Sequence, residues 1–529
     1  MARFKRVYPF LFTTIPILNV LARNPGGSTL DDVGALILTM VLGCALLYAT
    51  AALVMRGRSR KSLVPLVVLV AVVWFYAYPA VRSSYHLSRG TPARMALTGG
   101  AILVLAGAMI ALALWLGRRP ALLQRVNTFL ALTGLLLTGF LGARVVADQL
   151  RARSQLKTSS LVSELSQPIR PAPVARLAQG KAARDIYLVV LDEYANSGVL
   201  AERFGFDNHV FEDSLRRLGF TIPPLVRSNY VHTLLSIPSL LNFSHLSSLG
   251  TELGLQATDP TLPNHLVENN RTAAFLKSHG YRFVFYPSQW WISTRHNRNA
   301  DSEFRVWSGF DLAREATRSD LRRAFVSSTP LTLLLNSDRH DADHVERTLA
   351  GLEELPADSR PTFALAHLLN PHYPYVFNMD AGCRPYAARP RGGWGQGREK
   401  AYLAQVQCLN NLLLGTVTEL LQRSSPSPVI LLVGDHGTNS LGYSDAKSAQ
   451  DVSPAQARER FGAFGAFYLP SGGSRVLADS VTLVSVLPRV LNHYFDAGIG
   501  VPPDSLYMSL ERTPYSLVPV DPASLSPRM

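Results

Sequence analysis

Cysteine is scarce in this chain, whose 529 residues include only three. Cys44 lies in a long apolar run, so it is excluded as a partner for the other two. Cys383 and Cys408 lie in the more polar remainder, and they can pair if that part of the chain is in an oxidising compartment. A Cys383–Cys408 disulfide is therefore a hypothesis that free-thiol labelling would test.

Long apolar runs are also missing after about residue 148, although the mean hydropathy of +0.11 is high for a soluble protein. The first part of the chain must therefore hold most of the apolar excess. A run interrupted by Pro16 opens the series, but no small-x-small cleavage site follows it, which argues against a signal peptide. Runs long enough to cross about 30 Å of hydrocarbon fall near 7–22, 33–55, 63–82, 95–117 and 126–147.

Lys and Arg are distributed unevenly among the connections between these runs, which predicts an orientation. With the N-terminus in the cytoplasm, the inner segments hold Arg3, Lys5, Arg6, Arg56, Arg58, Arg60, Lys61, Arg118, Arg119 and Arg125. The outer segments hold only Arg23, Arg82, Arg89 and Arg94. Five spans then place everything after residue 148 outside the cytoplasm. Because this rule accounts for part of the net charge of +14, we do not interpret the charge as a sign of nucleic-acid binding.

After residue 148, the composition of the chain changes twice. A polar stretch interrupted by Pro168, Pro171 and Pro173 is typical of a stalk with one short amphipathic helix, and prolines recur in the last residues of the chain. The predicted organisation is a transmembrane domain (1–148), a stalk (149–182), an extracytoplasmic domain (183–510) and a flexible tail (511–529).

Short apolar runs alternate with helical periodicity from residue 185 onward, and we find no internal repeat. Buried strands are predicted at 185–191, 281–287, 362–369, 428–435 and 465–470. Helices are predicted at 209–219, 271–279, 340–354 and 400–423. This alternation predicts an α/β sandwich with a mostly parallel sheet, in which ligands gather at the carboxyl ends of the strands.

Acidic residues follow two of these strands. Asp192 and Glu193 come after the first, where carboxylates could bind a divalent cation, although Asp192 could simply cap the next helix. Asp435 and His436 follow the strand LLVG, and Gly437 permits a sharp turn. Carboxylate and imidazole on consecutive residues suit Zn²⁺ or Mn²⁺, although an ordinary turn has the same pattern.

A third strand end carries the sequence HLLNPHYPY. His367, His372 and Asn370 could offer hydrogen-bond donors to an anionic oxygen there. The alternative is a purely structural role, which is the commoner role of a single histidine.

The stretch SNYVHTLLSIPSLLN predicts a helix that begins near Thr233, with Ser236 three positions further on. A hydroxyl at a helix N-terminus lies beside free N–H groups that attract phosphate or sulfate, although it could equally be a simple cap. Residues 236–239, Ser-Ile-Pro-Ser, nearly match the sulfatase signature, but Leu240 occupies the position of its arginine.

Together these motifs resemble the alkaline phosphatase superfamily, and within it the membrane-anchored sulfatase-like proteins that include phosphoethanolamine transferases and lipoteichoic acid synthases. The resemblance covers residues 184–510 and is strongest at VVLDEY, TLLSIPSLL, HLLNPHYPY and LLVGDHG. Several transmembrane helices followed by an exported catalytic domain is also the layout of that group.

The resemblance implies roles for individual residues. The transferase motif aligns its nucleophilic threonine with Thr233, whereas matching the sulfatase signature letter by letter would select Ser236. We prefer Thr233, because it keeps the nucleophile at the helix N-terminus and because Leu240 argues against formylglycine maturation. The implied ligands of one divalent ion, Zn²⁺ or Mn²⁺ rather than Ca²⁺ or Mg²⁺, are Asp192, Glu193, Thr233, Asp435 and His436. The implied substrate-binding residues are His372, His367, Asn370 and Ser236.

The function implied is transfer of a phospho-alcohol group, of phosphoethanolamine or phosphoglycerol type, from a membrane phospholipid to a glycan or glycolipid through a phospho-threonine. The location implied is the inner membrane, with the catalytic domain in the periplasm. A phosphodiesterase or sulfatase would use the same residues, and a non-catalytic envelope scaffold is a further alternative.

Overall fold

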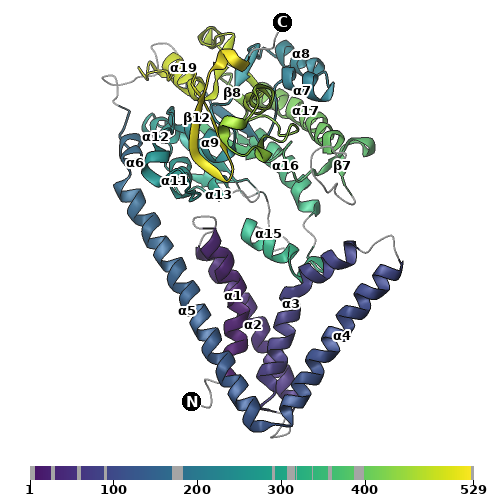
Figure 1. Ribbon diagram of the computed structural model, residues 1–529. Coiled ribbons are helices and arrows are strands. Elements are labelled where there is room, and N and C mark those ends of the chain that lie inside the picture. Colours follow the sequence, from purple (N-terminus) through teal and green to yellow (C-terminus); the bar gives the residue numbers. More distant parts are fainter. Residues whose placement is uncertain are drawn as a thin grey trace. The chain divides into compact units, whose positions relative to one another are not determined.

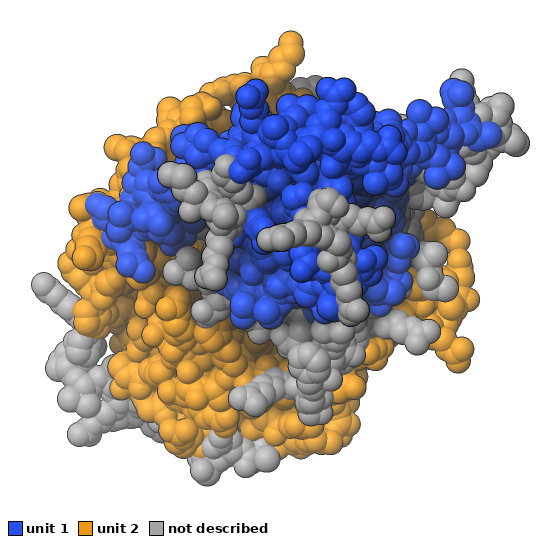
Figure 2. Space-filling view, turned by 90° about the horizontal axis from the view of Figure 1, so that it is seen from below, with its two compact units in different colours: residues 1–154, 311–336 blue, residues 155–310, 337–529 orange. Residues whose placement is uncertain are grey.

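A computed structural model describes residues 6–24, 30–55, 61–87, 92–169, 183–288, 292–304, 306, 316, 319–335, 338–355, 360–386 and 398–525 (Figure 1). The chain forms two compact units, coloured separately in Figure 2. Unit 1 comprises Met1–Ser154 and Asp311–Asn336, and unit 2 comprises Gln155–Phe310 and Ser337–Met529.

Unit 1 is helical. Its long helices are α1 (Tyr8–Arg23), α2 (Leu30–Val54), α3 (Val64–Leu87), α4 (Pro92–Gly117) and α5 (Pro120–Thr158), whose last residues belong to unit 2. Four segments within them are long and apolar enough to cross a membrane: Val33–Val54, Val64–Ser83, Ala96–Gly117 and Pro120–Thr158.

The first of the five expected spans differs from the other four. Helix α1 has 16 residues, with Pro16 inside it. At 1.5 Å per residue it is about 24 Å long, which is short of the hydrocarbon thickness. The Tyr8 hydroxyl on α1 donates a hydrogen bond to Asn127 Oδ1 on α5 at 2.9 Å, so the short helix is joined to its neighbours by a polar contact as well as by packing.

Part of the predicted contiguous domain 183–510 belongs instead to unit 1. Helix α15 (Asp320–Ser327) and the 3₁₀ helix η2 (Pro330–Leu333) come from this part. Leu321 and Phe325, four residues apart and therefore on one face of α15, are buried beside Ile17, Val33 and Leu36. A short amphipathic helix has the same sequence pattern whether it covers a soluble core or a membrane bundle. The sequence therefore did not reveal that α15 belongs to unit 1.

The predicted stalk is also more ordered than its prolines indicated. Helix α5 continues to Thr158, and α6 (Ser160–Leu165) follows at once, capped by Ser159, whose Oγ accepts a hydrogen bond from Val162 N. Leu161, Val162 and Leu165 are buried in a core of unit 2. Residues 170–182 of the predicted stalk lie outside the described residues.

Unit 2 is built on a six-stranded sheet with the order β4-β3-β5-β1-β8-β9. All neighbours are parallel except β8 and β9, and the five strands predicted from the sequence are all present. Their described bounds are β1 Ile186–Leu191, β3 Arg282–Tyr286, β4 Ser302–Glu303, β5 Thr362–Leu368, β8 Val429–Gly434 and β9 Gly465–Tyr468.

Helices cover both faces of this sheet, as expected for an α/β sandwich. Tyr187 and Val189 of β1 pack on one side with α8 (His209–Arg217), α16 (Asp338–Glu353) and α17 (Arg398–Arg423). Leu188 and Val190 pack on the other side with α9 (Thr233–Asn242), α12 (Arg271–Ser278) and α19 (Leu483–Phe495). Because β1 is buried on both faces, it is apolar at every position.

Shorter elements complete unit 2. They are α7 Ser197–Phe204, β2 Leu225–Arg227, α10 Leu249–Leu253, α11 Thr261–Glu268, α13 Ile292–Arg295, β6 Phe377–Asn378, β7 Arg384–Pro385, α18 Pro454–Phe461, β10 Ser480–Thr482, β11 Leu506–Leu510 and β12 Thr513–Val520.

The C-terminal residues are not the loose tail that their prolines predicted. Strand β12 pairs antiparallel with β11, and Tyr515 within it is fully buried, with its hydroxyl donating to Asp259 O at 2.5 Å. The prolines are tolerated because β12 lies at the edge of a two-stranded sheet, where not every N–H is needed.

Truncation tests whether β12 stabilises the fold. A chain that ends at Glu511 should unfold at a lower temperature than the full chain, because it loses β12 and leaves the pocket of Tyr515 empty. The expected loss of free energy of unfolding is at least about 3 kcal/mol. A matched chain that ends at Leu525 should unfold like the full protein. Equal melting temperatures for both truncations would show that β12 contributes nothing.

Candidate metal centre and nucleophile

The candidate acids lie together at the carboxyl ends of two paired strands. Asp192 follows β1 and Asp435 follows β8, and these strands pair in register up to Leu191 and Gly434. The Glu193 N–H donates to Asp435 Oδ1 at 3.1 Å, which fixes one loop against the other. The parallel register therefore brings together residues that are more than 200 positions apart in the sequence.

Gly437 is required by close packing rather than by backbone freedom. A Cβ atom at this position would lie 2.0 Å from the carbonyl oxygen of Glu459 and 2.7 Å from that of Gly462. The Gly437 N–H donates to the carbonyl of Arg460 at 2.8 Å. The Asp435-His436-Gly437 loop is thus pressed directly onto the end of α18.

Thr233 is the first residue of α9, and its side chain faces this centre. Its Oγ1 lies 3.2 Å from His436 Nε2. Ser236, one turn further on, is buried and donates its hydroxyl hydrogen to Asp435 O at 2.5 Å. The hydroxyl beside the acids is therefore that of Thr233, while Ser236 supports the backbone of the Asp435 loop.

The residues present fit a divalent metal ion. Ligand atoms of Asp192, Asp435 and His436 all lie within 4.8 Å of one another, and all three side chains are buried. His436 Nδ1 is 3.1 Å from Gly437 O, so we assign its proton there, which leaves the Nε2 lone pair facing the carboxylates. Asp192 Oδ1 and Asp435 Oδ2 are buried with no hydrogen-bond partner among the described residues. An ion between these atoms would satisfy all of them.

Burial disfavours the charged forms of these side chains when no ion is bound. It raises the pKa of Asp192 well above its usual range, and the neighbouring carboxylates of Asp435 and Glu193 raise it further. It raises the pKa of Asp435 to about 6 and holds the pKa of His436 well below its ordinary value. Two carboxylates and a neutral imidazole in this setting form a site that favours a cation.

Glu193 was among the predicted metal ligands, but it lies outside the group formed by Asp192, Asp435 and His436. Its backbone has a positive φ of 62°, and its Oε1 lies 3.4 Å from Arg460 Nη1 while its Oε2 lies 4.0 Å from His372 Nε2. The sequence left open which acid of the pair would bind metal. The structure places Asp192 in the group and turns Glu193 toward two basic side chains.

Arg460, on the last turn of α18, was missed by the sequence analysis. Its buried guanidinium donates to Val231 O at 2.6 Å and to Gly437 O at 2.5 Å, and its Nη2 lies 3.4 Å from His436 Nε2. Two positions earlier, Arg458 pairs with Glu202 nearer the surface. Nothing in the local sequence separates these two arginines, so only the fold identifies the one at the centre.

His367 and Asn370, predicted to bind substrate, are both buried. His367 is fully buried, with Nδ1 2.6 Å from Thr294 Oγ1 and Nε2 3.7 Å from Asp192 Oδ2, and burial lowers its pKa to about 3. At this distance its Nε2 faces Asp192 without a hydrogen bond to any described residue. Asn370 is also buried and donates to Gln405 Oε1 at 3.3 Å. Among the predicted histidines of this loop, His372 alone is substantially exposed, at 37% of its side chain.

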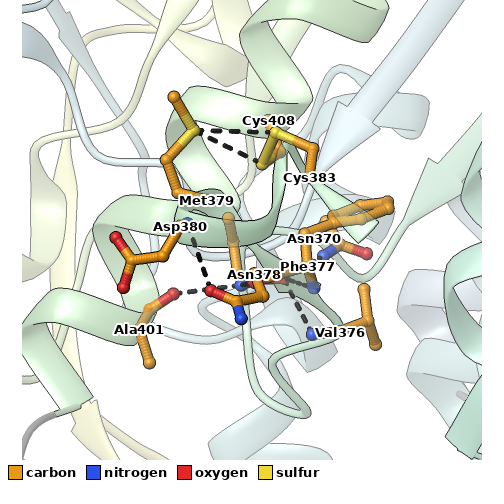
Figure 3. Close-up of a disulfide and its surroundings, with 10 residues drawn as sticks. Asn370, Val376, Phe377, Asn378, Met379, Asp380, Cys383, Ala401 and Cys408 are labelled. Atoms are coloured by element: carbon orange, nitrogen blue, oxygen red, sulfur yellow. Dashed lines mark hydrogen bonds between the residues drawn. A yellow bond between two sulfur atoms is a disulfide. The ribbon is translucent and has the colours of Figure 1, made fainter. Parts of the chain in front are cut away.

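The loop that carries His372 is anchored to α17. A disulfide joins Cys383 to Cys408, the pairing that the sequence left open, and Figure 3 shows it beside Met379. Gln405 Oε1, on the same helix, accepts hydrogen bonds from the backbone N–H groups of Val376 and Phe377 at 2.8 Å each. Covalent and hydrogen-bonded attachments therefore hold this loop next to the acidic centre.

The sequence matches no protein-family model and no curated protein. Among solved structures, the Zn complex of the C-terminal periplasmic domain of EcEptC from Escherichia coli is similar over 65% of this chain and 94% of that chain. The TM-score is 0.43 and the identity is 13%. The C-terminal periplasmic domain of phosphoethanolamine transferase EptC from Campylobacter jejuni is similar over 59% and 90%, with a TM-score of 0.38 and 10% identity.

A third similar structure is BT1596, a 2-O GAG sulfatase, which covers 61% of this chain and 72% of that chain with a TM-score of 0.36 and 14% identity. With every one of these TM-scores below 0.5, the assignment of function rests on the residues of this chain.

The pKa of Asp435 predicts how pH and metal act together. In the metal-free protein, the folded state keeps a proton up to about pH 6, whereas the unfolded chain releases it near its ordinary pKa of 3.8. The contribution of Asp435 to stability should therefore fall as pH rises through this window, by on the order of 3 kcal/mol. The buried His436 and His367, whose pKa values are lowered, act in the opposite direction, so the Asp435 contribution is measured against a variant that lacks it. With Zn²⁺ bound, this fall should disappear, because the ion replaces the proton.

Thermal unfolding between pH 4 and 7, with Zn²⁺ or with a chelator, measures both trends. When both are metal-free, the unaltered chain should lose stability relative to the Asp435→Asn variant as pH rises from 4 to 6. A metal-free chain that gained stability relative to Asp435→Asn from pH 4 to 6 would contradict this account.

Proposed function

We propose that this chain is a membrane-anchored, metal-dependent transferase that moves a phospho-alcohol group from a phospholipid to an alcohol on a glycan or glycolipid through a phospho-threonine. The observation that carries the proposal is the position of the Thr233 hydroxyl, 3.2 Å from His436 Nε2 in the group formed with Asp192 and Asp435, at the start of a helix. The alternative hydroxyl, Ser236, is committed to a backbone carbonyl.

Each group has a defined part in the first step. A Zn²⁺ or Mn²⁺ ion held by Asp192, Asp435 and His436 would neutralise charge on the phosphate and favour the ionised threonine. Thr233 Oγ1 forms a bond to phosphorus while the bond from phosphorus to the lipid oxygen breaks. The hydroxyl proton passes to one of the buried carboxylates beside it, and protonated His372 gives its proton to the departing lipid alcohol.

The second step reverses these transfers. The acceptor alcohol gives its proton to His372 and attacks phosphorus, and the bond between phosphorus and Thr233 Oγ1 breaks as the threonine recovers its proton. Glu193, 4.0 Å from His372 Nε2, stabilises the charged imidazole between the two steps. Water in place of the acceptor alcohol would make the same site a hydrolase.

The apolar helices of unit 1 support a lipid donor. Four segments can cross a membrane by length and composition. The distribution of Lys and Arg calls for a fifth crossing, which α1 would supply in spite of its 16 residues if the bilayer thins locally around it. We place unit 2 on the periplasmic side of the inner membrane, where phospholipid headgroups and envelope glycans are both within reach.

Substitution of the nucleophile tests the proposal. Thr233→Ala should lower transfer by about 10⁴-fold or more, because the covalent route is lost, while the protein still binds its metal. Ser236→Ala should keep the adduct on Thr233, at a cost of about 1 kcal/mol in stability from the lost hydrogen bond.

The measurements are the mass of the peptide that contains Thr233 after incubation with phospholipid vesicles, and the metal content of each purified variant. Full transfer by Thr233→Ala, or an adduct on Ser236, would refute the assignment. An adduct on Thr233 that is released to water in the presence of acceptor glycans would favour the hydrolase. Purified protein that contains no metal in any preparation would favour the alternative of a non-catalytic envelope scaffold.

A further inference from the structure

Two tyrosines and an arginine form a cluster beside this centre that the mechanism above does not use. The guanidinium of Arg398, the first residue of α17, lies 4.8 Å from the ring centre of Tyr373 and 5.9 Å from that of Tyr375. The two rings meet edge to face, with centres 5.7 Å apart. Tyr373 follows His372 directly in the sequence, so the cluster adjoins the exposed histidine of the site.

The cluster contains buried polar atoms that have no partner among the described residues. These are the hydroxyl of Tyr375, a residue that is only 1% exposed, and Nε of Arg398. A buried hydroxyl or N–H without a hydrogen bond costs about 1–3 kcal/mol, so native proteins seldom retain one unless it is used. Both atoms are hydrogen-bond donors, and the tyrosine oxygen can also accept. They can therefore bind a ligand that carries oxygen atoms.

Glu193 connects this cluster to the reacting centre. It follows Asp192 in the chain and lies 4.0 Å from His372 Nε2. Its negative charge acts on Tyr375, whose pKa burial raises first and Glu193 raises further. The positive charge of Arg398 in turn acts on Glu193, whose pKa burial raises and the nearby basic groups lower. The cluster is therefore within electrostatic range of the residue next to the metal group.

The charge of the cluster selects against a cationic headgroup. Of the two carboxylates that act on Tyr375, Glu193 acts more strongly than Glu399, and Arg460 already lies 3.4 Å from Glu193. An ammonium group would therefore add a third positive charge to those of Arg398 and Arg460, against the two carboxylates Glu193 and Glu399. The aromatic faces that could hold an ammonium by a cation–π contact already carry the guanidinium of Arg398.

We propose that Arg398, Tyr373 and Tyr375 form the headgroup subsite of the donor lipid, and that it takes the uncharged, hydroxyl-bearing glycerol of a phosphoglycerol headgroup in preference to ethanolamine. The glycerol hydroxyls accept hydrogen bonds from Arg398 and exchange them with the Tyr375 hydroxyl. The proposal rests on the phosphotransfer proposed above and narrows its donor to one class.

Competition between two lipids tests the subsite. The full-length chain, loaded with Zn²⁺, is incubated with vesicles of equal parts phosphatidylglycerol and phosphatidylethanolamine, and the adducts on Thr233 are separated by mass. We expect the phosphoglycerol adduct in at least about tenfold excess. Arg398→Gln should bring the ratio of the two adducts close to one, and Arg398→Lys should give an intermediate ratio because it keeps the charge but loses the planar fork.

Arg423→Gln is the matched control. Arg423 lies at the opposite end of the same helix and pairs with Glu419 at 3.0 Å, so its loss should leave the ratio of adducts unchanged. Melting temperatures of both variants show whether the helix itself is intact, and the ratio is independent of how much active protein each preparation contains.

The outcomes separate the two proposals. An ethanolamine adduct equal to or greater than the glycerol adduct, or an unchanged ratio in Arg398→Gln, would overturn the subsite and leave the phospho-threonine route standing. An absence of any adduct on Thr233 from either lipid would overturn both proposals together.

Discussion

The burial of two carboxylates at one edge of the sheet is the constraint on which the rest of the site depends. Asp192 and Asp435 lie out of contact with water, and each has an oxygen atom without a hydrogen-bond partner among the described residues. Like charges in such a place raise each other's pKa and destabilise the fold unless a cation or protons offset them. The neutral imidazole of His436 and the Thr233 hydroxyl complete a set of atoms that suits a divalent ion better than protons.

Two arginines supply positive charge around this centre. Arg460 bonds to carbonyls of two loops and lies beside both Glu193 and His436, so it joins the segments of the site and balances one of its acids. Once Glu193 is matched in this way, it is a weak ligand for metal and a suitable partner for His372. Arg398 adds a further positive charge over the rings of Tyr373 and Tyr375, next to the exposed His372.

Hydrogen bonds, close packing and a disulfide hold the loops of the candidate site in place. Ser236 holds the Asp435 loop by a hydrogen bond, and the close contact at Gly437 allows no displacement of this loop toward α18. The disulfide and Gln405 hold the His372 loop on α17. Of the four residues that the resemblance marked as substrate-binding, Ser236, His367 and Asn370 are buried and His372 is substantially exposed.

The sequence by itself determined the strands of the sheet, the acids that follow β1 and β8, and the helix that begins at Thr233. These are local matters: a strand buried on both faces must be apolar throughout, and a residue after such a strand must lie at its end. Tertiary structure alone decided that Asp192 rather than Glu193 joins the metal group, that Arg460 rather than Arg458 reaches the centre, and that β12 is a strand in spite of its prolines. It also assigned α15 to unit 1. Each of these depends on what a side chain meets from distant parts of the chain, and charge, polarity or proline content at a single position does not encode that neighbour.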